Sequence, residues 1–91
     1  MINKYLIRFF NGDEKPITLP VKAENPEVVS NNIIAAYQER WLSFPVTDKF
    51  TRDLGAERIS VNLEKVKYFR VEKPTKVMLE NYDEKDFILF E

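Results

Sequence analysis

Residues 25–43, NPEVVSNNIIAAYQERWLS, set the fold class because they join a helix start to apolar residues at helical spacing. Asn25 can cap a helix, and Pro26 suits the first helical position. Pro45 disfavours helical geometry in the residue before it, so the helix should end ahead of that proline. We therefore predict one amphipathic helix over residues 26–43. Its apolar stripe consists of Val29, Ile33, Ala36 and Tyr37.

Two strands are expected before this helix. In residues 17–22 apolar side chains alternate with others, and in residues 2–10 apolar side chains recur at every second position. This period of two indicates half-buried strands. Asn11-Gly12 lies between them, and this pair favours a tight hairpin turn. Pro20 cannot donate to a strand ladder, so the second strand is predicted to lie at a sheet edge. One face of the first strand carries Tyr5, Ile7 and Phe9, and the other carries Leu6, Arg8 and Phe10.

The segments after the helix are predicted to add further strands. Residues 58–63 and 67–72 alternate and are separated by a short polar turn, which favours a second hairpin. Two short apolar runs, 77–79 and 87–90, are interpreted as short strands. A helical turn near 76–82 is the alternative for the first of them.

Length and composition favour one α+β domain over residues 1–91. The chain leaves no room for a second core, and its nearly balanced charge and 44% hydrophobic content favour a folded chain. The predicted architecture is an N-terminal β-hairpin, one helix and then a mainly antiparallel sheet, about ββαββ with one or two short C-terminal strands. Residues 45–56 are expected to form a loop, with a helical turn around 49–54.

The composition removes most of the usual tools of catalysis. The chain contains no cysteine and no histidine, so it lacks the usual thiol nucleophile, the usual general base and the usual zinc ligands. Its two glycines cannot form a dinucleotide fingerprint or a P-loop. The sequence predicts a protein that is not an enzyme and uses no cofactor or metal. A small enzyme that relies on carboxylates and lysines is the least favoured alternative.

The leading hypothesis is a binding or assembly module that acts through protein–protein contacts, including self-association. Its candidate contacts include an apolar C-terminal run, which is apolar on both faces of a strand and needs burial on both sides, in this chain or on another. Trp41 and Arg40 close the predicted helix and belong to residue types enriched at interfaces, although a tryptophan there is more often part of the core. The C-terminal contacts are Phe87, Ile88, Leu89 and Phe90.

The second hypothesis is a nucleic-acid-binding regulator that uses the basic strand 65–76. Cationic residues interleave there with Tyr68 and Phe69, but the exposed face of one strand presents at most one aromatic ring. The sequence pI of about 5.5 and an acidic segment at 80–91, which could shield the basic strand, weigh against this hypothesis. The candidate polyanion contacts are Lys65, Lys67, Arg70 and Lys73.

The sequence suggests a cytoplasmic location. No stretch is apolar enough to span a bilayer, and Lys4 and Arg8 interrupt the apolar run at the start, where a signal peptide would be continuous. The richness in Lys, Asn, Ile, Glu and Phe is similar to that of small proteins from AT-rich bacterial or phage genomes.

Overall fold

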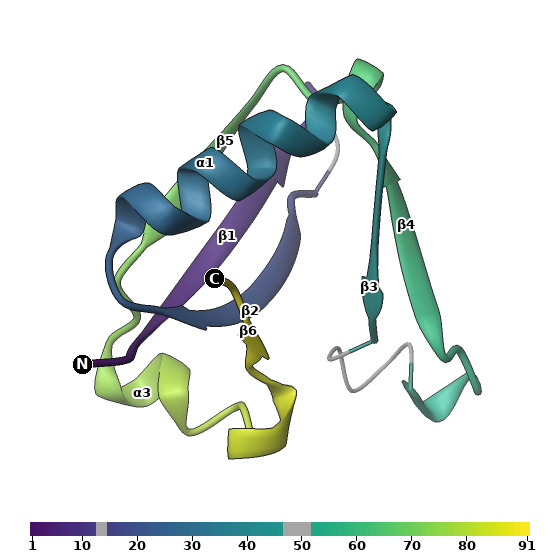
Figure 1. Cartoon of the computed structure of the whole chain (residues 1–91). Helices are drawn as coiled ribbons and strands as arrows, with labels where there is room; N and C mark the ends of the chain where they lie inside the picture. The colour runs from purple at the N-terminus through teal and green to yellow at the C-terminus, as the bar shows by residue number, and fades with distance from the viewer. Residues whose placement is uncertain (13–14, 47–51) are drawn as a thin grey trace.

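The structure is a computed structural model that describes residues 1–12, 15–46 and 52–91. The chain is α+β, with an N-terminal hairpin followed by a helix, as the sequence predicts (Figure 1). The turn residues 13–14 and the start of the helical turn predicted over 49–54 lie outside the described residues. The elements are β1 (Asn3–Phe10), β2 (Ile17–Ala23), α1 (Pro26–Ala36), η1 (Tyr37–Glu39), β3 (Trp41–Pro45), β4 (Arg58–Asn62), η2 (Leu63–Lys65), β5 (Tyr68–Glu72), α3 (Lys76–Leu79), η3 (Glu84–Asp86) and β6 (Ile88–Leu89).

The strands form two sheets. The larger sheet has the order β5-β1-β2-β6, and β3 pairs with β4 in a separate hairpin. β1 is antiparallel to both of its neighbours, whereas β6 runs parallel to β2. In Figure 1 helix α1 lies across the larger sheet, and the β3–β4 hairpin stands beside it.

One apolar cluster joins the larger sheet, the helix and the hairpin. The alternation predicted for the first two strands is confirmed on the face of the central cluster, whose side chains are buried. The strands are not simply half-buried, however, because Leu6 and Pro20 on the opposite face are fully buried as well. The stripe of the helix is also confirmed at Val29 and Ile33, both fully buried. The buried cluster consists of Tyr5, Ile7, Phe9, Leu19, Val21, Ala23, Val29, Ile33, Phe44, Val61 and Leu63.

The predicted end of the helix is wrong. Helix α1 ends at Ala36, continues for one 3-10 turn and stops at Arg40, whose φ of 67° lies in the left-handed region. Trp41 then begins strand β3 instead of closing the helix. The reason lies in the tertiary structure. As a strand paired with β4, this segment buries Phe44 in the core, and that contact outweighs its helical preference.

The predicted hairpin over 58–63 and 67–72 is also wrong. β4 pairs with β3, and β5 pairs with β1 in the other sheet. The short polar turn between β4 and β5 is the 3-10 helix η2. Asn62 caps its start, because the Asn62 side chain accepts a hydrogen bond from the Glu64 N–H at 3.1 Å. Leu63 is buried in η2 and holds this turn against the core, where the chain passes from one sheet to the other.

Three predictions about the sheet edge and the C-terminal segment can be compared with the structure. Pro20 does not lie on an edge strand, because β6 pairs with β2 at Val21 and Lys22. The first apolar run is the helical turn α3, capped by Thr75, so the helical alternative holds there. The second run contributes β6, which docks on this chain.

Candidate functional site

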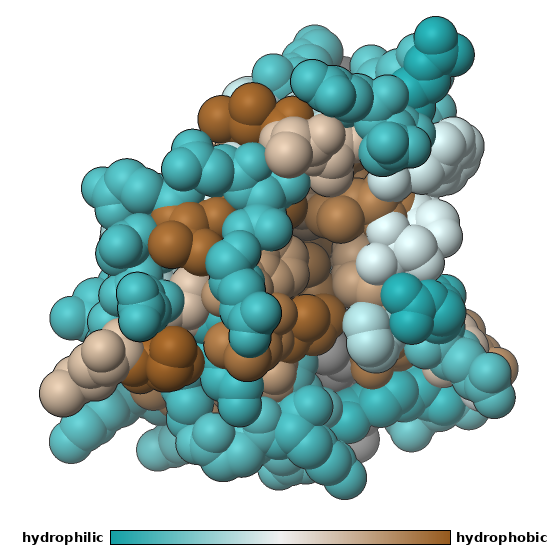
Figure 2. Space-filling view, in the orientation of Figure 1, coloured by the Kyte–Doolittle hydropathy of each residue, from teal (hydrophilic) through white to brown (hydrophobic). Residues whose placement is uncertain are grey.

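An apolar groove runs between α1, β3 and β6. It encloses about 600 Å³, and Figure 2 shows apolar side chains gathered in the hollow between the helix and the hairpin. We call it the α1–β3–β6 groove. Its lining residues are Asn32, Ala35, Ala36, Leu42, Leu89, Phe90 and Glu91.

The C-terminal segment is held firmly on one wall of this groove. The Phe90 N–H donates to the Lys22 carbonyl at 2.9 Å, which continues the parallel pairing with β2. The Asn32 amide donates to the Glu91 carbonyl at 3.0 Å, which ties the segment to α1. Phe87 is buried, so the segment is anchored at both ends while Leu89 remains 48% exposed.

Backbone groups of two strands point toward the groove. In a ladder, successive residues direct their N–H and C=O to opposite sides, and Phe90 directs its N–H to β2. The backbone groups of Leu89 therefore point away from β2. In the hairpin, the Leu63 N–H donates to the Arg40 carbonyl, and the Val46 N–H donates to the Glu57 carbonyl. The backbone groups of the even-numbered residues of β3 therefore point toward β4.

By the same alternation, the backbone groups of Trp41 and Ser43 point away from β4. β3 lies on the side of the hairpin nearer to β6 in Figure 1, and Leu42 of β3 lines the groove together with Leu89. The groove is therefore flanked by two strand edges, one from each sheet.

One carboxylate side chain lies in the lining of the groove. Glu91 lines the groove and also a second one of about 340 Å³ on the other side of Leu89 and Phe90, where Glu24 joins it. Val28 and Ile2 complete the second groove. Apolar walls below carboxylates favour an apolar segment that carries positive charge.

The predicted partner contacts separate into two groups. Leu89 and Phe90 line the groove, whereas Phe87 and Ile88 pack into the protein. Trp41 is 55% exposed at the start of β3 rather than in the core, because its side chain points away from the face that carries Phe44. Arg40 pairs with Glu64 at 3.3 Å on the surface, outside the groove lining.

The four predicted polyanion contacts do not form one cluster. Lys67 and Lys73 flank the two ends of β5, and the extended chain between them spans roughly 20 Å. Lys65 lies in η2, and Arg70 is the member within the strand.

In the described residues, the ion pairs of the acidic segment 80–91 are made with residues outside the basic strand. Glu84 pairs with Lys4, and Asp86 pairs with Arg52 at 3.3 Å.

Sequence reasoning missed two residues on the outer face of the sheet. Phe10 of β1 lies opposite Tyr68 of β5, and Arg8 lies opposite Arg70. The expectation that the exposed face of this strand presents at most one aromatic ring is confirmed, because Tyr68 is exposed and Phe69 packs against the core. The alternation had placed Arg8 and Phe10 on one face, but nothing local indicated that β5 would pair beside them.

Several ionisable groups are engaged in structural contacts. Asp86 is buried and accepts hydrogen bonds from Arg52 and from the Asp83 N–H, which closes the first turn of η3. A hydrogen bond from Lys4 holds the pKa of the Glu84 carboxyl below its ordinary value, and burial raises the pKa of the Tyr37 hydroxyl. In the part of the chain that the structure describes, no cluster of three or more acidic residues could hold a metal ion.

The sequence matches no protein-family model, and the chain matches neither a curated protein nor a solved structure. Across residues 1–12, 15–46 and 52–91, no helix has the length and apolar character needed to cross a membrane.

Proposed function

We propose that this chain is a non-catalytic protein-binding module that accepts an extended segment of a partner protein in the α1–β3–β6 groove. The observation that carries the proposal is the pair of strand edges that flank an apolar groove. An extended segment laid there gains main-chain hydrogen bonds from Leu89 on one side and from Trp41 and Ser43 on the other.

The groove also defines the character of the segment. Alternate side chains of a bound strand point to one face, so every second residue would contact Ala35, Leu42 and Phe90. The carboxylate of Glu91 in the groove, and that of Glu24 in the neighbouring groove, favour lysine or arginine in the segment. The preferred partner is therefore an extended segment that alternates apolar residues and includes basic ones. We place the protein in the cytoplasm, which the cysteine-free composition supports.

A selection from a displayed library of random ten-residue peptides tests this function. The enriched peptides should alternate apolar residues and carry lysine or arginine. Fluorescence anisotropy should then show that Leu89→Ser weakens their binding about tenfold, equivalent to about 1.4 kcal/mol. Val77→Ser is the matched control, because Val77 is an exposed apolar residue of α3 outside the groove lining.

Amide exchange measured by NMR provides the structural readout. A bound peptide should slow exchange at Leu89 and Ser43, whose N–H groups point toward the groove, more than at Phe90, whose N–H already bonds to β2. Absence of enriched peptides, or equal binding by Leu89→Ser and the parent, would refute the proposal. A concentration-dependent dimer that Leu89→Ser abolishes would instead identify a second copy of this chain as the occupant.

A further inference from the structure

The outer face of the larger sheet carries a stack of planar groups. The rings of Phe10 and Tyr68 are parallel to within 11°, with centroids 4.7 Å apart. The guanidinium carbon of Arg70 lies 4.7 Å from the centroid of the same Phe10 ring. Tyr68 is 53% exposed, so the row ends in an aromatic surface that is open to solvent.

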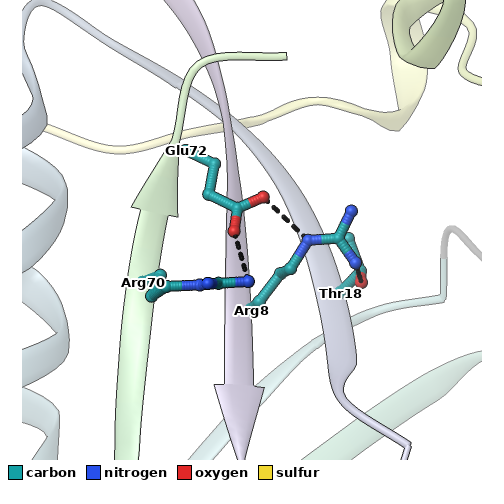
Figure 3. A network of polar contacts seen from close by, with 4 residues as sticks. All are labelled: Arg8, Thr18, Arg70 and Glu72. Carbon is teal, nitrogen blue, oxygen red and sulfur yellow. Dashed lines mark hydrogen bonds and ion pairs between the residues drawn. The ribbon is translucent and has the colours of Figure 1, made fainter. Parts of the chain in front are cut away.

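A polar network extends from this stack across three strands. Figure 3 shows the Glu72 carboxylate between two arginines, at 2.8 Å from Arg8 Nε and 2.9 Å from Arg70 Nη2. The Arg8 guanidinium continues to the Thr18 hydroxyl on β2 at 3.5 Å. One carboxylate thus faces two guanidinium groups and orients both of them.

The charge on this face is positive although the whole chain is slightly acidic. Lys67 is exposed beside Gly12 at the same end of β1, and its N–H donates to the Phe10 carbonyl at 2.8 Å. On this face two cations, Arg8 and Arg70, stand against the one carboxylate of Glu72. An anionic ligand would therefore be attracted to the aromatic end of the sheet.

We propose that this face, formed by Arg8, Phe10, Tyr68 and Arg70, binds single-stranded nucleic acid. An exposed ring beside cationic side chains suits a ligand in which flat bases alternate with phosphates. A duplex is disfavoured because the faces of its bases are already stacked on each other, so they cannot reach Tyr68. This site is separate from the α1–β3–β6 groove, which lies on the helix side of the sheet.

Fluorescence anisotropy with a labelled fifteen-nucleotide oligothymidylate at about 50 mM and 200 mM salt tests the site. Tyr68→Ala should weaken binding about tenfold, and Tyr68→Phe should retain it because the ring remains. Arg70→Ala should weaken binding and reduce the salt slope by about one. Trp41→Ala and Lys85→Ala are the matched aromatic and cationic controls, because both residues are exposed and lie off this face.

Two further probes separate the contributions of the ligand. An abasic oligonucleotide of equal length should bind more weakly and should not distinguish Tyr68→Ala from the parent. Thymidine monophosphate that binds as tightly as the oligonucleotide would show that the site takes a free nucleotide, and the proposal would fail. It would also fail if the parent does not bind at the lower salt, or if Tyr68→Ala and Arg70→Ala both bind like the parent. Peptide binding in the groove should be unchanged in Tyr68→Ala, so failure here is distinguishable from failure of the proposed function.

Discussion

Replacing Ile33 by alanine tests the orientation of α1, which forms one wall of the groove. Ile33 is 0% exposed and belongs to the central cluster, whereas its neighbour Ile34 is 59% exposed. Truncating a buried isoleucine costs about 2–5 kcal/mol, because transfer energy is lost and a cavity remains. For a domain of this size each kcal/mol lowers Tm by about 4–8 °C, so a loss of about 3 kcal/mol corresponds to roughly 12–24 °C.

The matched variant Ile34→Ala makes the same chemical change one position away. Because Ile34 is largely in solvent, its truncation should change the free energy of unfolding by no more than about 0.5 kcal/mol. Urea unfolding followed by circular dichroism measures both variants, and the slope with denaturant checks that unfolding remains two-state. Equal losses, or a larger loss for Ile34→Ala, would show that the helix is rotated relative to this description and that the groove is lined by other residues.

Two further predictions concern the backbone and the surface charges. Arg40→Val should destabilise the fold by about 1–2 kcal/mol in thermal or urea unfolding, because a β-branched residue tolerates a φ of 67° poorly. Arg40→Gly should be close to neutral. A neutral valine variant would contradict the left-handed geometry of this residue. The Lys4–Glu84 pair should stabilise the fold above the ordinary pKa of a glutamate, and its contribution should vanish as pH falls through the lowered folded-state pKa, so the Tm difference between the parent and Glu84→Gln should shrink on acidification between about pH 6 and pH 3. A difference that is constant with pH would exclude the pair as its source.

Elements marked by local signals were predictable. The cap at Asn25 is observed as a hydrogen bond from the Val28 N–H at 2.9 Å, and Gly12 adopts the positive φ that its turn requires. Features that depend on strand partners were not predictable. Leu89 was predicted as a partner contact and lines the groove. The groove itself could not be predicted, because one of its walls is β3, whose first residues were expected to be helical. The stack of Phe10 on Tyr68 exists for the same kind of reason, since β5 pairs with β1.

The sequence by itself determined the existence of the helix, the periods of the strands and the buried faces, because caps, turns and apolar spacing act through residues close in the chain. Only the tertiary structure decided that α1 stops at Ala36, that β4 and β5 belong to different sheets and that β6 runs parallel to β2. Strand pairing brings together residues far apart in the chain, and the burial of Phe44 and Leu63 outweighs local preference. Both proposed surfaces are products of those pairings.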